Sequence, residues 1–133
     1  MKTKKTIYLS GPITGVAKYW EAFEKVEDQV TGLGHIVLSP TRLPEGMTNE
    51  QYMRICFAMI DSADAVLFLP GSEGSDGAML EYSHCRYIDK PFTVLADCGP
   101  LGNPYPEKVA HAWLEHQLEE VLKGRILEGG TNG

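Results

Sequence analysis

The chain has 133 residues, of which 43% are hydrophobic and 23% charged, and its formal net charge is −6. This length allows one domain with a substantial core, and the composition is ordinary for a soluble globular protein. The negative charge argues against a broad nucleic-acid or anionic-membrane surface, because such surfaces need clustered lysine and arginine. It does not exclude a small anionic ligand, which backbone N–H groups can hold. We expect one domain over residues 1–127 and a flexible tail over residues 128–133.

Cysteine, histidine and the amino-terminal segment predict a cytoplasmic protein that needs no metal or other cofactor. The cysteines are widely spaced, odd in number and without a CxxC pair, which favours reduced thiols in apolar positions: Cys56, Cys85 and Cys98. The four histidines show no paired metal-ligand spacing. The basic start MKTKK precedes an apolar run of only about four residues, which is too short for a signal peptide or a membrane span.

Apolar runs alternate with helical patterns along the chain. The runs are short and bounded by Gly or Pro, whereas the helical patterns have apolar residues at spacings of three and four. Thr48 and Gln51 have the spacing of a capping box at the start of the second helix. The predicted strands cover residues 7–10, 35–40, 65–70 and 91–96, and the predicted helices cover residues 19–33, 48–63, 77–89 and 109–122.

This alternation predicts a parallel sheet with helices on both faces, joined by right-handed crossovers. We expect a three-layer α/β fold, flavodoxin-like or Rossmann-like, with strand order 2-1-3-4. The Pro/Gly-rich connection at residues 97–106 leaves two alternatives open, a fifth short strand or a lid. In such sheets ligands lie beyond the carboxyl ends of the strands, at the point where the strand order reverses. In the expected order that point lies between the first and third strands.

The loops after these two strands are the candidate ligand-binding segments. Glycine lets the backbone approach a ligand closely, and the helix start at Gly77 favours an anion such as phosphate. Neither loop matches the GxGxxG or P-loop pattern. The alternative is a pair of surface turns in which Ser75 or Asp76 simply caps the third helix. The candidate binding residues are Ser10, Gly11, Pro12, Ile13, Gly15, Gly71, Ser75, Gly77 and Ala78, with Arg42 and Arg86 as further candidates for a phosphate.

Glu81 occupies a position where an apolar residue is expected. Ala78, Glu81, Cys85 and Ile88 follow at spacings of three, four and three, which places them on one helix face. That face should look onto the sheet, about one turn from the helix start and close to the expected cleft. Burial of a carboxylate is costly unless the group is paired or used. The alternative is a shifted register, with Tyr82 buried and Glu81 in solvent.

Three segments resemble the nucleoside 2-deoxyribosyltransferase family, which includes deoxynucleoside 5′-monophosphate N-glycosidases and bacterial and phage relatives. They are IYLSGPITG from residue 7, DSADAVLFLPG from residue 61 and GSDGAMLEYSHCRYIDKP from residue 74, and the resemblance covers roughly residues 6–95. It implies that Glu81 is a nucleophile, which attacks the anomeric carbon of a sugar and displaces the nucleobase. It also implies that Tyr8 lies close to this nucleophile.

The resemblance also implies a substrate class and an assembly. In the monophosphate-hydrolysing branch a serine six residues before the glutamate binds the phosphate, and Ser75 has that spacing. The family forms dimers or larger homo-oligomers, and an exposed apolar stripe on the last helix would fit such a contact. Its usual helper aspartate, early in the helix before the third strand, is replaced by Arg54 or Ile55, which leaves Asp76 as the tentative acid or base.

The sequence therefore predicts cleavage or transfer at the N-glycosidic bond of a (deoxy)nucleoside 5′-monophosphate. The catalytic residues would be Glu81, Tyr8 and Asp76. Two alternatives belong to other classes of protein. One is a non-catalytic nucleotide-binding protein that keeps the cleft, and the other is a structural or interaction module without a ligand.

Overall fold

The computed structural model describes residues 3–95 and 107–127, and for residues 107–112 it describes the backbone alone. The expected tail at residues 128–133 and the connection at residues 97–106 lie outside the described residues.

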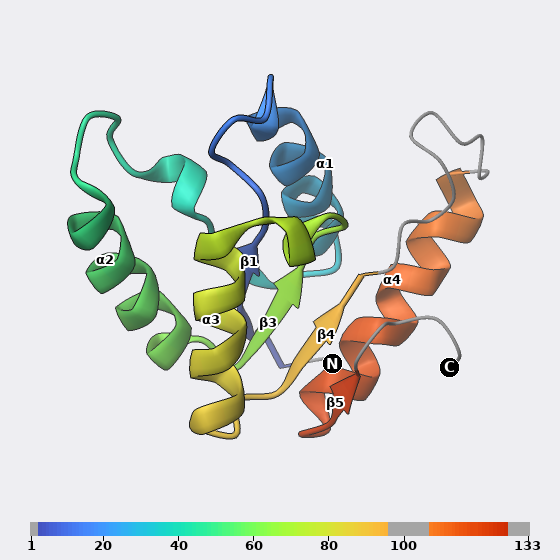
Figure 1. The fold of residues 1–133 in the computed structure, drawn as a ribbon. Helices are drawn as coiled ribbons and strands as arrows, with labels where there is room; N and C mark the ends of the chain where they lie inside the picture. The colour runs from blue at the N-terminus through green and yellow to red at the C-terminus, as the bar shows by residue number, and fades with distance from the viewer. Residues whose placement is uncertain (1–2, 96–106, 128–133) are drawn as a thin grey trace.

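A parallel sheet of five strands in the order β2-β1-β3-β4-β5 forms the middle layer of the fold (Figure 1). The expected α/β class and the order 2-1-3-4 are confirmed. A fifth strand exists, but it follows the last helix at residues 126–127, because the chain returns along β4 after that helix. The strands are β1 (Thr6–Ser10), β2 (Ile36–Leu38), β3 (Ala65–Phe68), β4 (Phe92–Val94) and β5 (Ile126–Leu127).

In the described part of the chain, four α-helices and two 3₁₀ turns surround this sheet. α1 and α4 pack on one face, and α2 and α3 pack on the other (Figure 1). The capping box between Thr48 and Gln51 is confirmed and fixes the start of α2. The elements are α1 (Tyr19–Gly32), η1 (Pro40–Arg42), α2 (Asn49–Ser62), η2 (Ser72–Gly74), α3 (Asp76–Tyr87) and α4 (Glu107–Leu122).

β1 divides its side chains between the two faces of the sheet. Ile7 and Leu9 belong to the apolar core beneath α1 and α4, whereas Tyr8 belongs to the core beneath α2 and α3. This is the period of two that a strand imposes on successive side chains. Ser10 therefore points to the same side as Tyr8, toward α3, where its hydroxyl donates a hydrogen bond to Glu81. All four residues of β3 are buried, as expected for a strand that is covered on both faces.

The loops after β1 and β3 lie side by side, because these strands are neighbours in register. Ser10 pairs with Phe68, and the Leu69 N–H donates to the Ser10 carbonyl at 2.8 Å. A Cβ on Gly71 would lie 3.5 Å from Cγ of Pro12, so the two loops are in contact. The expected convergence of the two loops is therefore observed at the carboxyl edge of the sheet.

Gly11 is the residue that allows this close approach. A Cβ at this position would lie 3.0 Å from Cβ of Leu69 and 3.1 Å from Cζ of Phe23. We expect Gly11→Ala to lower the free energy of unfolding by about 1–3 kcal/mol, the usual cost of overpacking, as measured by urea denaturation. Gly32→Ala is the matched control, because a Cβ there meets nothing within 4 Å. Equal midpoints for the two variants would contradict this account of the loop contact.

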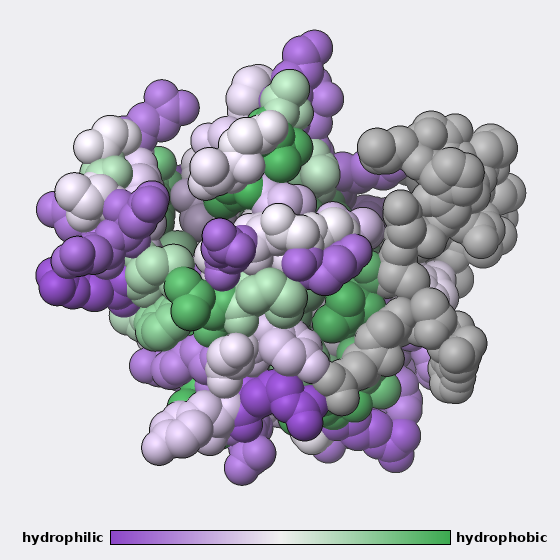
Figure 2. All heavy atoms as spheres, in the orientation of Figure 1, coloured by the Kyte–Doolittle hydropathy of each residue, from purple (hydrophilic) through white to green (hydrophobic). Residues whose placement is uncertain are grey.

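The last helix contributes to the core rather than to an exposed surface. Its described side chains Leu114, Leu118 and Val121 are buried against the sheet, so the apolar stripe gives no support for a subunit contact. Exposed apolar residues lie elsewhere, for example Leu80 and Tyr87 on α3. Figure 2 shows apolar areas interrupted by polar ones over the face that carries α2 and α3. Among the described helices, none combines the length and apolar character needed to cross a membrane.

Candidate active site

Glu81 points from α3 toward the sheet, as its place in the apolar stripe predicts. Its side chain is only 6% exposed, and its neighbours on the stripe, Ala78 and Cys85, are also buried. Ile88 lies beyond the end of α3 and is 38% exposed, so the stripe ends before it. Tyr82 packs partly buried against the core on the same side of the sheet but does not take the place of Glu81. The shifted register is therefore not observed.

Both carboxylate oxygens of Glu81 accept hydrogen bonds from β1. The hydroxyl of Tyr8 donates to Oε2 at 3.0 Å, and the hydroxyl of Ser10 donates to Oε1 at 2.6 Å. Tyr8 and Ser10 are two residues apart, so both side chains leave β1 on the face that α3 covers. A carboxylate has about four lone-pair positions, and these two bonds leave others available. The two hydrogen bonds thus hold the carboxylate in one orientation and leave some of its lone pairs free to accept further bonds.

Burial sets the protonation of this cluster. Removal from water raises the pKa of Glu81, and the hydrogen bonds from Ser10 and Tyr8 act in the opposite direction. Burial and the adjacent Glu81 carboxylate raise the pKa of Tyr8 well above its usual range. Tyr8 therefore keeps its proton at neutral pH and acts as a donor to the carboxylate, not as a base.

A raised pKa at Glu81 means that the buried charge lowers stability at neutral pH. The unfolded carboxyl titrates near its ordinary value of 4.5, and the folded carboxyl takes up its proton at a higher pH. The contribution of Glu81 to stability is therefore most unfavourable above the folded pKa and recovers as the pH falls toward 4.5. We expect Glu81→Gln, which removes the charge but keeps the shape, to increase the free energy of unfolding near pH 7 by about 1 kcal/mol.

Urea unfolding of the wild-type and Glu81→Gln proteins from pH 4 to pH 8 would measure this effect. The advantage of the variant should shrink as the pH falls and disappear below the unfolded pKa of the carboxyl group. Glu73→Gln removes an exposed carboxylate from η2 and should leave the pH dependence unchanged. A Glu81→Gln variant that is less stable than the wild type at every pH would contradict the electrostatic account.

The predicted binding residues of the first loop follow Ser10, the last residue of β1, at the carboxyl edge of the sheet. Gly11, Pro12 and Ile13 are half-buried, and Ile13 packs against the core beneath α1 and α4. Gly15 is exposed with a φ of 77°, a conformation that favours glycine. Ser10 differs from expectation in one respect: its hydroxyl is directed to Glu81, so its observed partner is the carboxylate. Its role in binding a ligand stays a prediction.

The second loop leads directly into α3. Gly71 has a φ of 89° and precedes η2. Ser75 is the N-cap residue of α3, and its Oγ accepts a hydrogen bond from the Ala78 N–H at 3.2 Å. Gly77 is half-buried in the first turn, and Ala78 is buried. The ordinary cap is therefore observed, and a contact of Ser75 with phosphate stays a prediction.

Two aspartates flank β3 in the sequence, Asp64 before it and Asp76, the tentative acid or base, after it. Asp76 is exposed at the start of α3, and five helical residues place it about 140° around the helix axis from Glu81. Asp64 accepts from the Thr6 N–H at 2.8 Å, at the opposite, amino edge of the sheet. On α2, Arg54 and Ile55 are exposed. A helper role for Asp76 stays a prediction.

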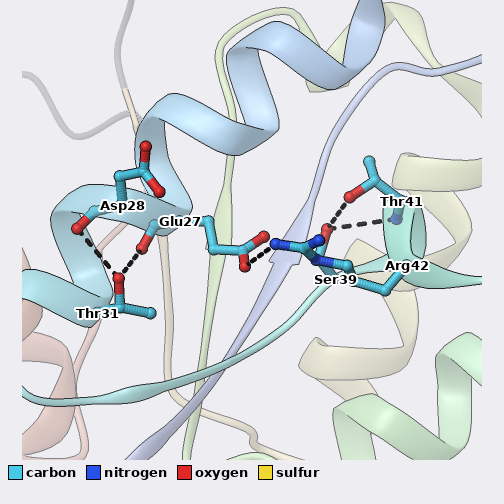
Figure 3. A network of polar contacts seen from close by, with 6 residues as sticks. All are labelled: Glu27, Asp28, Thr31, Ser39, Thr41 and Arg42. Atoms are coloured by element: carbon cyan, nitrogen blue, oxygen red, sulfur yellow. Dashed lines mark hydrogen bonds and ion pairs between the residues drawn. The ribbon is translucent and has the colours of Figure 1, made fainter.

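Arg42, a candidate phosphate contact, is engaged with α1. Its Nη2 donates to Oε2 of Glu27 at 2.6 Å, and Figure 3 shows the two side chains extended toward each other. This carboxylate raises the pKa of Arg42. The guanidinium charge is thus balanced within the protein, which weakens the argument that it binds a phosphate.

Sequence reasoning missed one member of the cluster. Cys56, which the sequence suggested was a reduced thiol in an apolar position, is buried on α2 and belongs to the same packed cluster of buried residues as Tyr8. The available signal was its position on the apolar stripe of a helix that precedes β3. Cys85 is a free buried thiol as well, whereas Cys98 lies outside the described residues. Within the described residues, no group of three or more His, Cys, Asp or Glu side chains is arranged to hold a metal ion.

A cavity of about 450 Å³ lies elsewhere, near the amino ends of β1 and β2. Lys5, His35 and Lys123 are among its lining residues, and none of Tyr8, Ser10 or Glu81 reaches it. The candidate site is therefore defined by its buried polar cluster and by the converging loops, not by this cavity.

These features define a parallel α/β protein with a buried carboxylate at the carboxyl edge of β1 and β3. Residues 5–94 match the family described as a domain of unknown function, DUF4406, and the chain belongs to this family. The comparison with curated proteins gives no match.

Two solved structures have the same fold. A 2-deoxyribosyltransferase from the psychrotolerant bacterium Bacillus psychrosaccharolyticus is 21% identical with a TM-score of 0.58, over 71% of this chain and 74% of that chain. A conserved protein from Enterococcus faecalis V583 is 14% identical with a TM-score of 0.55, over 95% of this chain and 82% of that chain. The resemblance to 2-deoxyribosyltransferases that the sequence motifs indicate is thus confirmed for the fold.

Proposed function

We propose that this protein cleaves or transfers the N-glycosidic bond of a (deoxy)nucleoside 5′-monophosphate, with Glu81 as the nucleophile. The observation that carries the proposal is the buried carboxylate of Glu81, bonded to Tyr8 and Ser10 at the edge where two glycine-rich loops meet. A carboxylate beside an anomeric carbon can stabilise an oxocarbenium-like transition state and then bond to the carbon. The fold shared with a 2-deoxyribosyltransferase supports the same proposal.

The reaction has two displacements at C1′ of the sugar. A Glu81 oxygen bonds to C1′ as the C1′–N bond breaks, and the bonding electron pair leaves with the base, which takes up a proton. Water then attacks C1′, the ester C–O bond breaks, its electron pair returns to the carboxylate and the second proton of the water enters solvent. A second base in place of water gives transfer. Tyr8 keeps the carboxylate oriented in both steps.

The second loop and the start of α3 supply the proposed phosphate site. N–H groups of the first helical turn and the helix dipole favour an anion there, and Ser75 adds a hydroxyl. The rim residues Gly11 to Gly15 and Gly71 would hold the sugar. Asp76 is the proposed helper that protonates the leaving base. In solution the protein is proposed to form a dimer or larger homo-oligomer.

A second candidate function is nucleotide binding without catalysis. The observation that favours it is the composition of α2, which carries Arg54 and Ile55 at exposed positions. α2 thus offers no carboxylate at the place where the resembling family carries its helper aspartate. A protein of this kind would keep the cleft and sense or sequester a nucleotide.

Incubation of the purified protein with a panel of deoxynucleoside monophosphates and the matched nucleosides separates these functions. Chromatography should detect free base, formed faster from the monophosphates than from the nucleosides. Addition of a second base distinguishes transfer from hydrolysis. Binding without base release, unaffected by Glu81→Ala, would favour the non-catalytic candidate, and no binding at all would contradict both.

A further inference from the structure

The carboxyl half of α3 is joined to α2 through His84. Its Nε2 atom lies 2.8 Å from Oδ1 of Asp61, in the last turn of α2. A carboxylate only accepts hydrogen bonds, so Nε2 carries the proton and donates. The imidazole ring also stacks on Phe57, one turn earlier on α2, with ring centroids 4.4 Å apart and an angle of 7° between the ring planes. Two directional contacts therefore connect the helices.

His84 and Tyr82 lie on opposite sides of Glu81 around the axis of α3. At about 100° per residue, Tyr82 lies about 100° to one side of Glu81, and His84 lies about 60° to the other side. The ring centroid of Tyr82 is 5.8 Å from that of Phe68 on β3 and 5.1 Å from that of Phe92 on β4. A rotation of α3 that moved the carboxylate away from β1 would therefore disrupt contacts on both sides of the helix.

We propose that His84 is a positioning residue, which fixes the rotation of α3 so that the Glu81 carboxylate meets the two hydroxyls of β1. Its effect on the carboxylate requires no activity, whereas its effect on base release rests on the proposed function. Apolar packing is not directional, but a hydrogen bond weakens steeply as its angle changes. The Ser10–Glu81 bond, the shorter of the two from β1 at 2.6 Å, reports such a rotation.

A gain in stability alone does not account for the pair. The Asp61 side chain is 58% exposed, and exposed pairs of this kind contribute little to the free energy of unfolding. The His84 side chain, in contrast, is only 20% exposed and packs its ring on Phe57. The contact is thus better suited to set the direction of α3 than to stabilise the fold.

A second role for His84 would be electrostatic. Burial raises the pKa of Glu81, and the imidazole of His84 is among the groups that act in the opposite direction. Glutamine at position 84 separates the two roles, because its amide N–H can replace the Nε2–H donor while the side chain carries no charge. His84→Gln therefore keeps the bond to Asp61, and His84→Ala removes it.

The test is a double-mutant cycle between Ser10 and His84, measured near pH 7 by urea denaturation of the whole chain. Ser10 bonds to Glu81 and His84 bonds to Asp61, so a merely structural role for His84 predicts independent effects on the folding equilibrium constant, to within about twofold. We expect the factor by which Ser10→Ala lowers this constant to be at least about threefold smaller in His84→Ala than in the wild type. In His84→Gln, Ser10→Ala should have its wild-type effect.

Two further substitutions are controls for the cycle. Ser72 is a buried serine whose hydroxyl donates to the Leu69 carbonyl, so Ser72→Ala should have the same effect in the wild type and in His84→Ala. His116 is an exposed histidine on α4, on the other face of the sheet, and His116→Ala should leave the effect of Ser10→Ala unchanged. Independent effects of Ser10→Ala and His84→Ala would overturn the proposal, and so would the same coupling in His84→Gln.

The proposal and the proposed function can fail separately. Where base release is established, His84→Ala should lower kcat by about tenfold or more and leave KM within about twofold, because a small displacement of the nucleophile slows the chemical step. His84→Gln should recover kcat. A protein without base release would still give the stability cycle. If His84→Ala does not fold, the same cycle with Asp61→Ala distinguishes coupling, which we expect, from independence, which would overturn the proposal.

Discussion

Replacement of Glu81 with glutamine is expected to lower base release from a deoxynucleoside monophosphate by at least about a thousandfold, as is usual for loss of a nucleophile. The amide keeps the shape of the side chain, but only one of its two terminal atoms is an oxygen that can accept from Tyr8 or Ser10, and it cannot form the ester with C1′. Initial rates from chromatography would measure the loss. Calorimetry should show that the variant still binds the nucleotide.

Glu73→Gln is the control for this result. Glu73 is an exposed carboxylate on η2, in the same loop region, so its removal changes the local charge without touching the buried cluster. We expect its rate to stay within about twofold of the wild type, as for most surface substitutions. Similar rates for the wild-type and Glu81→Gln proteins would remove Glu81 from the mechanism.

Replacement of Ser10 with alanine is expected to lower kcat/KM by about tenfold to a hundredfold. This range corresponds to the usual free-energy contribution of a hydrogen bond to a charged group. The Ser10–Glu81 bond is the shorter of the two from β1, at 2.6 Å. It also lowers the pKa of Glu81, so its loss should raise that pKa. Because the nucleophile must be ionised, activity rises with pH through the pKa of Glu81, and the acid limb of the profile should move to higher pH.

Ser72→Ala is the matched variant for Ser10→Ala. Ser72 is also a buried serine near the carboxyl edge, but its hydroxyl donates to the Leu69 carbonyl at 2.6 Å. Loss of that bond should lower stability and leave the acid limb of the pH profile in place. If both variants shift the limb equally, the effect reports a general change in the loops and not the bond to Glu81.

The layered fold could be predicted because it follows from local periods in the sequence. The apolar run of β3 indicated a strand covered on both faces, and the spacing from Ala78 to Cys85 indicated that Glu81 faces the sheet. The capping box at Thr48 follows from two side chains three residues apart. In each case the residues that allow the prediction lie close together in the sequence.

The features that could not be predicted depend on contacts between distant segments. β5 has only two residues, too few to show a period of two, and it is defined by pairing with β4. Ser10 and Glu81 are 71 residues apart, and only the packing of α3 over β1 directs the hydroxyl to the carboxylate. The packing of Cys56 in one buried cluster with Tyr8 likewise depends on how α2 packs against the sheet, which the sequence spacing does not fix.

The most direct test of the central claim is a search for the covalent intermediate. A deoxynucleoside monophosphate with fluorine at C2′ destabilises the oxocarbenium-like transition states, so an ester formed with the protein should break down slowly. Intact-mass and peptide mass spectrometry after brief incubation should show one sugar-phosphate adduct, located on Glu81 and missing from Glu81→Gln. An adduct on another residue, or rapid base release with no adduct on Glu81 at any time, would contradict the account.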